Sequence, residues 1–260
     1  MIRMLALSLF ALATAPVLAD PAVKPVAYEI DGTRFESLLV YNDTIRAVRP
    51  GLVMVPNWKG INDTAIARAR EIAGDRYIVL LVDMYGADVR PDSIQEAGQA
   101  SGAVLSDRAL TRTRITRAVA ELRSAADSLL QPGPVAAFGF CFGGTVVLEL
   151  ARSGAADVAG VVSFHGDPGP VEPAGKGEVK ASVLVLHGAA DGFVPPAQLR
   201  AFEEEMTAAA ADWTLVSFSG AQHCFAEAEA DGTNPPGCKY DATAAARAFA
   251  MFQQFLDERL

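Results

Sequence analysis

The stretch Gly139-Phe140-Cys141-Phe142-Gly143-Gly144 decides the fold of this chain. An apolar run precedes it at 135–138 and a helical-looking run follows it at 145–151. This pattern predicts a strand, a tight turn and a helix, with Cys141 at the apex. The glycines have a steric reason to be there, because such a turn is strained and its neighbours approach too closely for Cβ atoms. The arrangement is typical of a nucleophile elbow, with sulfur in place of the commoner hydroxyl.

The predicted helix directs its positive end at the sulfur of Cys141. That dipole favours a thiolate and any oxyanion that forms beside it. The alternative is a structural cysteine buried in a glycine-rich turn, since short motifs recur by accident. Partner residues elsewhere in the chain therefore decide whether Cys141 is a nucleophile.

Strand-like and helix-like segments alternate along the rest of the chain, with neither an internal repeat nor a long linker. Alternation of this kind predicts a mainly parallel sheet with helices on both faces, which is an α/β fold. Strands are predicted at 33–40, 52–55, 77–82, 158–164, 183–186 and 213–218. Helices are predicted at 62–73, 107–129, 196–210 and 242–256, and segment 85–106 is expected to form a cap-like excursion over the site.

The composition is that of a globular protein, since 51% of the 260 residues are hydrophobic and 20% are charged. The formal net charge is −9 and no basic patch stands out, which excludes nucleic acid and anionic membranes as expected partners. The sequence lacks both C-x-x-C and H-E-x-x-H spacing. We therefore expect no metal and no other cofactor, and a monomer or a weak dimer.

The first 19 residues have the pattern of an export signal. Arg3 precedes a short apolar run at 4–12, and 17–19 fit a small-x-small cleavage site that leaves Asp20 first. The run is too short to span a membrane, although an uncleaved anchor is the alternative. We expect export, to a periplasm, of a single domain formed by residues 20–260 that is free of the membrane after cleavage.

Export changes how the three cysteines are interpreted, because an oxidising compartment favours disulfides. Cys224 and Cys238 flank a glycine- and proline-rich loop at 232–237 and are predicted to pair. Closing this loop stabilises the fold by about 3 kcal/mol in the chain-entropy model. The alternative is that Cys224 is a small core residue. Pairing leaves Cys141 as the free, reactive thiol.

A thiol nucleophile requires a base within hydrogen-bond reach and a third group that orients the base. His223 lies in the loop after the predicted strand 213–218, which reaches the same edge of the sheet as Cys141. His165 and His187 each end a strand and precede a glycine, so we expect them to pack and hydrogen-bond near those ends. Chain order favours His223 as the base.

The orienting acid is expected between the nucleophile and the histidine in the chain, directly after a strand. Asp191 satisfies this requirement, and Asp167, after the preceding strand, is the runner-up. Considered without the other two residues, Asp191 would be interpreted as a turn aspartate, because Asp-Gly is a common turn dipeptide. The order Cys141, Asp191, His223 outweighs that interpretation.

An oxyanion hole needs two backbone donors. The amide of Phe142 is the first candidate, and the amide of Trp58, in the loop at 56–60 after a predicted strand, is the second. Trp58 serving as an aromatic wall is the alternative, and it is compatible with the donor role. The candidate substrate contacts are Asn57, Lys59, Phe193 and Phe225.

Several stretches in one order make the sequence resemble the dienelactone hydrolase family of α/β-hydrolases. They are the elbow at 139–144, Asp191-Gly192-Phe193-Val194-Pro195, His223-Cys224-Phe225 with Tyr240, and segments 57–62, 82–86 and 163–166. The likeness covers residues 28–258. It implies an α/β-hydrolase fold, a Cys141–His223–Asp191 triad, and hydrolysis of esters or lactones through a thioester without a cofactor.

Two positions depart from the family pattern. The family often has a glutamate near the cysteine that helps to generate the thiolate, and Asn57 occupies that place here. Because an amide cannot accept the proton, His223 must activate the thiol. Dienelactone-cleaving members have an arginine shortly after the histidine, whereas this chain has Glu227. We therefore do not expect dienelactone itself to be the substrate.

Two functions of other classes stay open on the sequence alone. One is a non-catalytic ligand-binding protein that retains the fold, because fold does not fix function. The other is a thiol-redox protein that works through Cys141 and Cys224. A Cys141–Cys224 bond would support the redox function, and a Cys224–Cys238 bond would exclude it.

Overall fold

The computed structural model describes residues 20–169 and 172–260. The expected export signal at 1–19 lies outside the described residues. None of the helices described in these ranges has the length and apolar character needed to cross a membrane.

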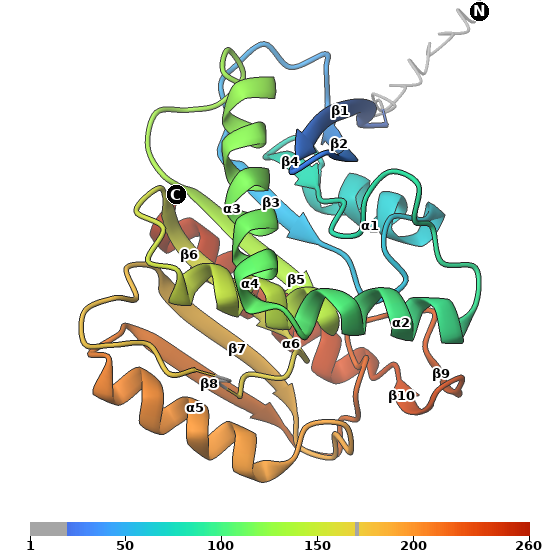
Figure 1. Ribbon diagram of the computed structural model, residues 1–260, viewed down its shortest axis with the longest axis vertical. Coiled ribbons are helices and arrows are strands. Elements are labelled where there is room, and N and C mark those ends of the chain that lie inside the picture. The colour runs from blue at the N-terminus through green and yellow to red at the C-terminus, as the bar shows by residue number, and fades with distance from the viewer. Residues whose placement is uncertain (1–19, 170–171) are drawn as a thin grey trace, which may run out of the picture.

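One sheet of eight strands forms the centre of the molecule (Figure 1). Its spatial order is β1-β2-β4-β3-β5-β6-β7-β8. The β1–β2 and β2–β4 pairs are antiparallel and all other neighbouring pairs are parallel, which confirms the predicted mainly parallel sheet. The strands are β1 (Ala22–Ile30), β2 (Thr33–Tyr41), β3 (Gly51–Val55), β4 (Ile78–Leu81), β5 (Val135–Phe140), β6 (Val158–Phe164), β7 (Ser182–Gly188) and β8 (Trp213–Phe218).

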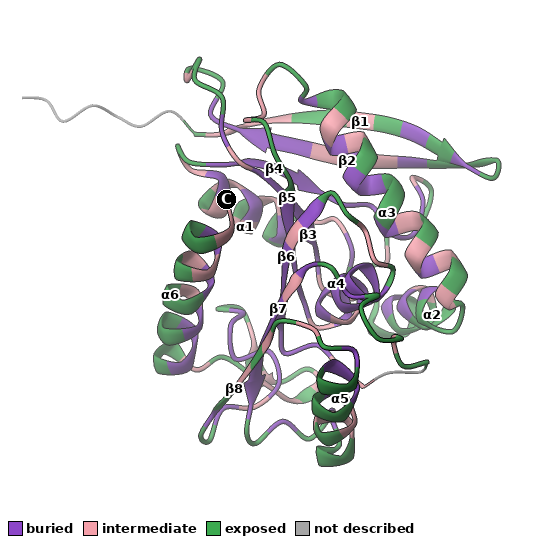
Figure 2. Ribbon diagram, turned by 90° about the vertical axis from the view of Figure 1, so that its left-hand side faces the viewer, coloured by how far each residue is buried: buried purple, intermediate pink, exposed green. Residues whose placement is uncertain are grey.

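Helices cover both faces of this sheet, as predicted (Figure 2). Two of them, α1 (Asp63–Ala73) and α6 (Ala242–Arg259), pack on one face. The opposite face carries α2 (Ile94–Leu105), α3 (Arg108–Ala125), α4 (Phe142–Arg152) and α5 (Pro196–Ala208). The side chains of Asn62 and Asp107 cap α1 and α3 as the sequence predicts. Helix α3 ends earlier than predicted, and α2 lies within the segment expected to be a cap-like excursion.

The two helical layers bury two separate cores against the sheet. Along the fully buried strand β3, Val53 and Val55 face the core beneath α3 and α4. Leu52 and Met54 face the core beneath α1 and α6. The alternation follows from the pleat of a strand that is covered on both faces.

The turn between β5 and α4 is held by a close approach of backbones. A Cβ atom on Gly143 would lie 2.2 Å from the carbonyl oxygen of Val55, and one on Gly139 would lie 2.3 Å from the carbonyl carbon of Gly143. Cys141 takes a positive φ of 52°, which L residues adopt only at a cost. The first turn of α4 therefore lies directly against the carboxyl end of β3.

The far end of α4 is fixed by a buried ion network. The guanidinium of Arg152 is fully buried and donates to both carboxylate oxygens of Glu205 at 2.9 and 2.7 Å. It also donates to Glu149 at 3.1 Å and to the carbonyl of Pro168 at 2.7 Å. These bonds satisfy a charge that is costly to bury unpaired, and they tie α4 to α5.

The disulfide between Cys224 and Cys238 is present, and it fastens a small hairpin beside the carboxyl edge of the sheet. The hairpin consists of β9 (Asp231–Thr233) and β10 (Pro236–Lys239), where the sequence indicated only a loop. The backbone amide of Lys239 donates to the carbonyl of His223 at 2.8 Å. The hairpin is thus bonded to the segment that carries the candidate base.

We predict that Gly143→Ala destabilises the fold by about 3 kcal/mol or more, because the added methyl group meets backbone that cannot move aside. Gly102→Ala is the matched control, since a Cβ atom there meets nothing within 4 Å in exposed helix α2. That change should stabilise by about 0.5–1 kcal/mol. Urea denaturation measures both free energies of unfolding, and equal stabilities would contradict the close approach.

Candidate active site

Cys141 lies at the carboxyl edge of the sheet, half-buried at the entrance to helix α4. Its backbone amide donates to the carbonyl of Phe164 at 2.9 Å, which fixes the turn against β6. The first amides of α4 have no partner within the helix, so they are free to donate to an anion beside the sulfur.

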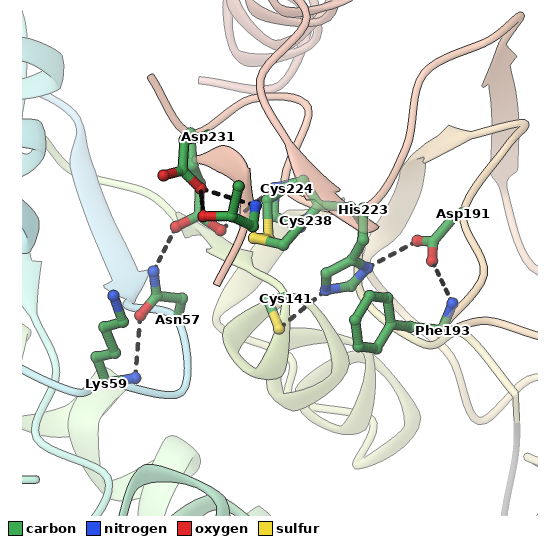
Figure 3. Close-up of a disulfide and its surroundings, with 12 residues drawn as sticks. Asn57, Lys59, Cys141, Asp191, Phe193, His223, Cys224, Asp231 and Cys238 are labelled. Carbon is green, nitrogen blue, oxygen red and sulfur yellow. Dashed lines mark hydrogen bonds and ion pairs between the residues drawn. A yellow bond between two sulfur atoms is a disulfide. The ribbon is translucent and has the colours of Figure 1, made fainter. Parts of the chain in front are cut away.

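His223 and Asp191 meet Cys141 from two other strands of the same edge. His223, in the loop after β8, has its Nε2 at 3.1 Å from the Sγ of Cys141. Its Nδ1 lies 2.7 Å from Oδ2 of Asp191, which follows β7. The second oxygen of Asp191 accepts bonds from the amides of Phe193 at 2.8 Å and Val194 at 3.3 Å, so the carboxylate is held rigidly. Figure 3 shows the three side chains in line.

The electrostatics of this set favour a protonated histidine beside the sulfur. Burial disfavours the imidazolium, but the hydrogen bonds to Asp191 and Cys141 outweigh it and raise the pKa of His223 to about 10. Burial also opposes the charge of Asp191, and the bond to His223 nevertheless holds the pKa of that carboxyl below its ordinary value.

The two other histidines and the runner-up acid, Asp167, lie near Cys141 or at neighbouring strand ends. His165 is fully buried, stacks edge-on against His223 with ring centroids 5.1 Å apart, and has its pKa lowered well below the ordinary value by burial. His187, at the end of β7, is buried and has its pKa lowered for the same reason. The carboxylate of Asp167 accepts a bond from the amide of Gly169.

The loop after β3 supplies the second candidate oxyanion donor. The carbonyl of Trp58 accepts a bond from the Tyr85 hydroxyl at 2.8 Å. The amide of Lys59 donates to the side-chain oxygen of Asn57 at 3.0 Å. The peptide between Trp58 and Lys59 is therefore held at both ends. Gly60, with a φ of 69°, closes the turn against the ring of Tyr85.

A pocket of about 290 Å³ opens at Cys141 and His223. Its walls are mostly apolar and come from Trp58, Leu105, Phe142, Phe193, Val194 and Pro235, together with the disulfide. Asp167 is its one charged wall residue outside the triad, and within the described residues no lysine or arginine lines it. The pocket thus suits an uncharged, apolar group next to the sulfur.

A second cavity of about 50 Å³ lies apart from this pocket, and more of its lining residues are polar or charged. Asn57, Lys59, Arg68, Glu227 and Glu229 are among its lining residues. Glu227 is only 8% exposed, and burial raises the pKa of its carboxyl to about 7. The carboxyl group of Glu227 therefore lies behind the site and does not line the pocket at Cys141.

The expected substrate contacts separate into different places. Phe193 lines the pocket, with its ring 4.8 Å from that of His223. Asn57 and Lys59 line the smaller polar cavity instead. Phe225 is fully buried in the core beneath α6, against His165, and reaches neither space as an exposed wall. Helix α2 contributes Ser101 and Leu105 to the pocket, so the segment at 85–106 does border the site.

Sequence reasoning missed two residues that shape the site. Tyr85 holds the Trp58 carbonyl, and the family-like stretch at 82–86 was the available signal for it. Thr145 donates its hydroxyl to the carbonyl of Asp167 at 3.2 Å and lines the pocket. No sequence signal marks Thr145, because it lies within an ordinary helical run.

Comparison with known proteins gives consistent matches. A family model described as the dienelactone hydrolase family matches residues 35–260. A solved dienelactone hydrolase-like promiscuous phosphotriesterase from metagenomic libraries is 33% identical, with a TM-score of 0.85, over 93% of this chain and 99% of that one. The solved structure m3DLH is 31% identical, with a TM-score of 0.86, over 93% of this chain and 100% of that one.

A relative from Bradyrhizobium, described as a probable 2-oxo-3-(5-oxofuran-2-ylidene)propanoate lactonase, is 28% identical over 78% of this chain and 85% of its own length. These matches favour neither the binding nor the thiol-redox alternative, and Cys224 is bonded to Cys238 and not to Cys141. The chain therefore belongs to the dienelactone hydrolase family and is a hydrolase of the ester and lactone type.

Proposed function

We propose that the protein hydrolyses uncharged carboxylic esters or lactones through a Cys141–His223–Asp191 triad and a thioester intermediate. The observation that carries this proposal is the line of contacts from Cys141 through His223 to Asp191, at 3.1 and 2.7 Å. These contacts support the roles of nucleophile for Cys141, proton carrier for His223 and orienting acid for Asp191.

In the first half of the reaction, the thiolate of Cys141 attacks the carbonyl carbon and the π electrons move to oxygen. The amides of Phe142 and Trp58 stabilise this oxyanion. The carbonyl then re-forms and the bond to the alkoxide breaks. The imidazolium of His223 gives its proton to the leaving oxygen, while Asp191 keeps the ring in position.

In the second half, neutral His223 takes a proton from a water molecule as its oxygen attacks the thioester carbon. The carbon–sulfur bond breaks, the acid product leaves, and the thiolate–imidazolium pair is restored. A thiolate suits activated esters and lactones better than amides, because its attack reverses easily when the leaving group is poor.

The walls of the pocket select the substrate class. Apolar side chains surround the reacting sulfur, and Asp167 adds a negative charge without a cation to balance it. A substrate carboxylate would lose its water there without gaining a partner. We therefore propose neutral esters and lactones, and not dienelactone, as substrates.

Replacing Cys141 by alanine should abolish hydrolysis of short aryl esters, with kcat lower by roughly 10⁴-fold or more, because a triad without its nucleophile retains only weak catalysis. The surface variant Gly102→Ala serves as the control for expression and folding. Full activity in both Cys141→Ala and Cys141→Ser would refute the mechanism.

The pH dependence should follow the raised pKa of His223. A group whose pKa is raised to about 10 stays protonated at every lower pH, so the imidazolium persists through neutral and mildly alkaline solution. We expect kcat/KM to hold up to pH 9 and to fall as the pH passes about 10, where the donor to the alkoxide is lost. If kcat/KM instead fell with rising pH around the ordinary histidine pKa of 6.5, His223 would not be the proton donor with the raised pKa. Return of activity at pH 8 controls for denaturation.

Charge discrimination is measured with two esters of similar shape, 4-nitrophenyl 4-methylpentanoate and mono-4-nitrophenyl succinate. The neutral ester should have the higher kcat/KM by about tenfold or more, because the pocket offers the carboxylate no partner. Asp167→Asn should narrow the gap by removing the repulsion. Equal values for the two esters in the unaltered protein would show that the pocket does not select by charge.

A further inference from the structure

The most unusual contact outside the triad joins two loops that are far apart in the sequence. The side-chain amide of Asn57 donates a short hydrogen bond to Oε2 of Glu227. Asn57 begins the loop that presents the Trp58 amide. Glu227 ends the turn that follows His223, because its own amide donates to the carbonyl of Cys224 at 2.8 Å. The bond therefore spans from the oxyanion loop to the histidine loop.

Both polar atoms of the Asn57 side chain form hydrogen bonds, each with a different residue. Its oxygen accepts from the Lys59 amide at 3.0 Å, while its nitrogen donates to Glu227. The same residue also accepts a bond at its carbonyl from the amide of Gly60 at 2.9 Å. The carboxylate of Glu227 thus fixes the orientation of the amide that shapes the turn around Trp58.

Glu227 is also in contact with the support of the catalytic histidine. Its Oε1 lies 3.7 Å from Nε2 of His165, and neither of these buried atoms has a hydrogen-bond partner among the described residues. The ring of His165 in turn packs edge-to-face against the ring of His223. A buried carboxylate without enough partners is expensive, so its place between two parts of the site calls for a functional reason.

We propose that Asn57 and Glu227 are positioning residues that hold the oxyanion loop in register with the histidine loop. The proposal rests on the proposed function, because it concerns the placement of the Trp58 amide in that reaction. Neither Asn57 nor Glu227 lines the pocket at Cys141, so they act through their neighbours and not by touching the substrate.

The test measures two reactions of the Cys141 thiol in the full-length chain. Ester hydrolysis needs the oxyanion hole, whereas alkylation of Cys141 by iodoacetamide needs only the thiolate and its histidine. Asn57→Ala and Glu227→Ala should lower kcat by about 10- to 100-fold, since a small misplacement of one oxyanion donor costs this much. We expect KM and the alkylation rate to stay within about threefold, because the pocket and the thiol–histidine pair remain.

A conservative variant and a control variant distinguish loss of the Asn57–Glu227 bond from a general disturbance of the fold. Glu227→Gln keeps an acceptor for Asn57 and should restore kcat to within about fivefold of the unaltered protein. Glu229→Gln is the matched control, because this exposed acid lines the same cavity and takes part in none of the hydrogen bonds of the described residues. It should leave kcat unchanged. If Glu227→Ala does not fold, Asn57→Ala and Glu227→Gln still decide the proposal.

The two alanine changes should also be non-additive, because both break the same bond. We expect the double variant to lose no more than about twofold beyond the worse single variant. The proposal would be overturned if the double variant lost the product of the two single losses in kcat. It would also be overturned if the single variants raised KM at normal kcat, or if their alkylation rate fell as much as their kcat. Retained activity in Cys141→Ala would overturn the proposed function itself. Inactive Cys141→Ala with normal kcat in Asn57→Ala would overturn only the positioning role.

Discussion

The approach of α4 to the end of β3 is the constraint on which the site depends. Only a backbone without a side chain at Gly143 fits against the carbonyl of Val55. The loop that leaves β3 is consequently placed beside the first turn of α4, so Trp58 and Phe142 both line the pocket at Cys141. The positive φ of Cys141, at the apex of this turn, is a local backbone cost that the surrounding packing must offset.

The environment of His223 combines burial with two hydrogen bonds, one to Asp191 and one to Cys141. Burial alone would lower the pKa of His223, but its hydrogen bonds to Asp191 and Cys141 outweigh burial and raise that pKa to about 10. The disulfide contributes on the same side, because it joins the residue after His223 to the hairpin that closes the pocket. The disulfide that stabilises this region therefore also helps to hold the segment that carries His223.

Chain order and local chemistry were enough to predict the fold class, the pairing of Cys224 with Cys238, and the residues that converge at Cys141. These features depend on the topology of a parallel sheet, which places successive strand ends at one edge. Side-chain direction was not predictable in this way. Phe225 directly follows Cys224 yet points into the core, and Asn57 precedes Trp58 yet faces another cavity. Strand β1 was missed because its mixed burial on an edge hairpin weakens the alternation.

The departures at Asn57 and Glu227 are best understood as one change. Asn57 replaces the acid that the family resemblance implies near the thiol. Glu227 replaces the cation that the resemblance implies near the substrate. In the structure the two side chains are bonded to each other, so one carboxylate is retained between the same two loops but comes from the opposite side. Its two oxygens contact the side-chain amide of Asn57 and the ring of His165, away from the pocket at Cys141. In the proposed reaction, proton transfer is then left to His223. The pocket has no lysine or arginine among its described lining residues, which is why we proposed neutral substrates.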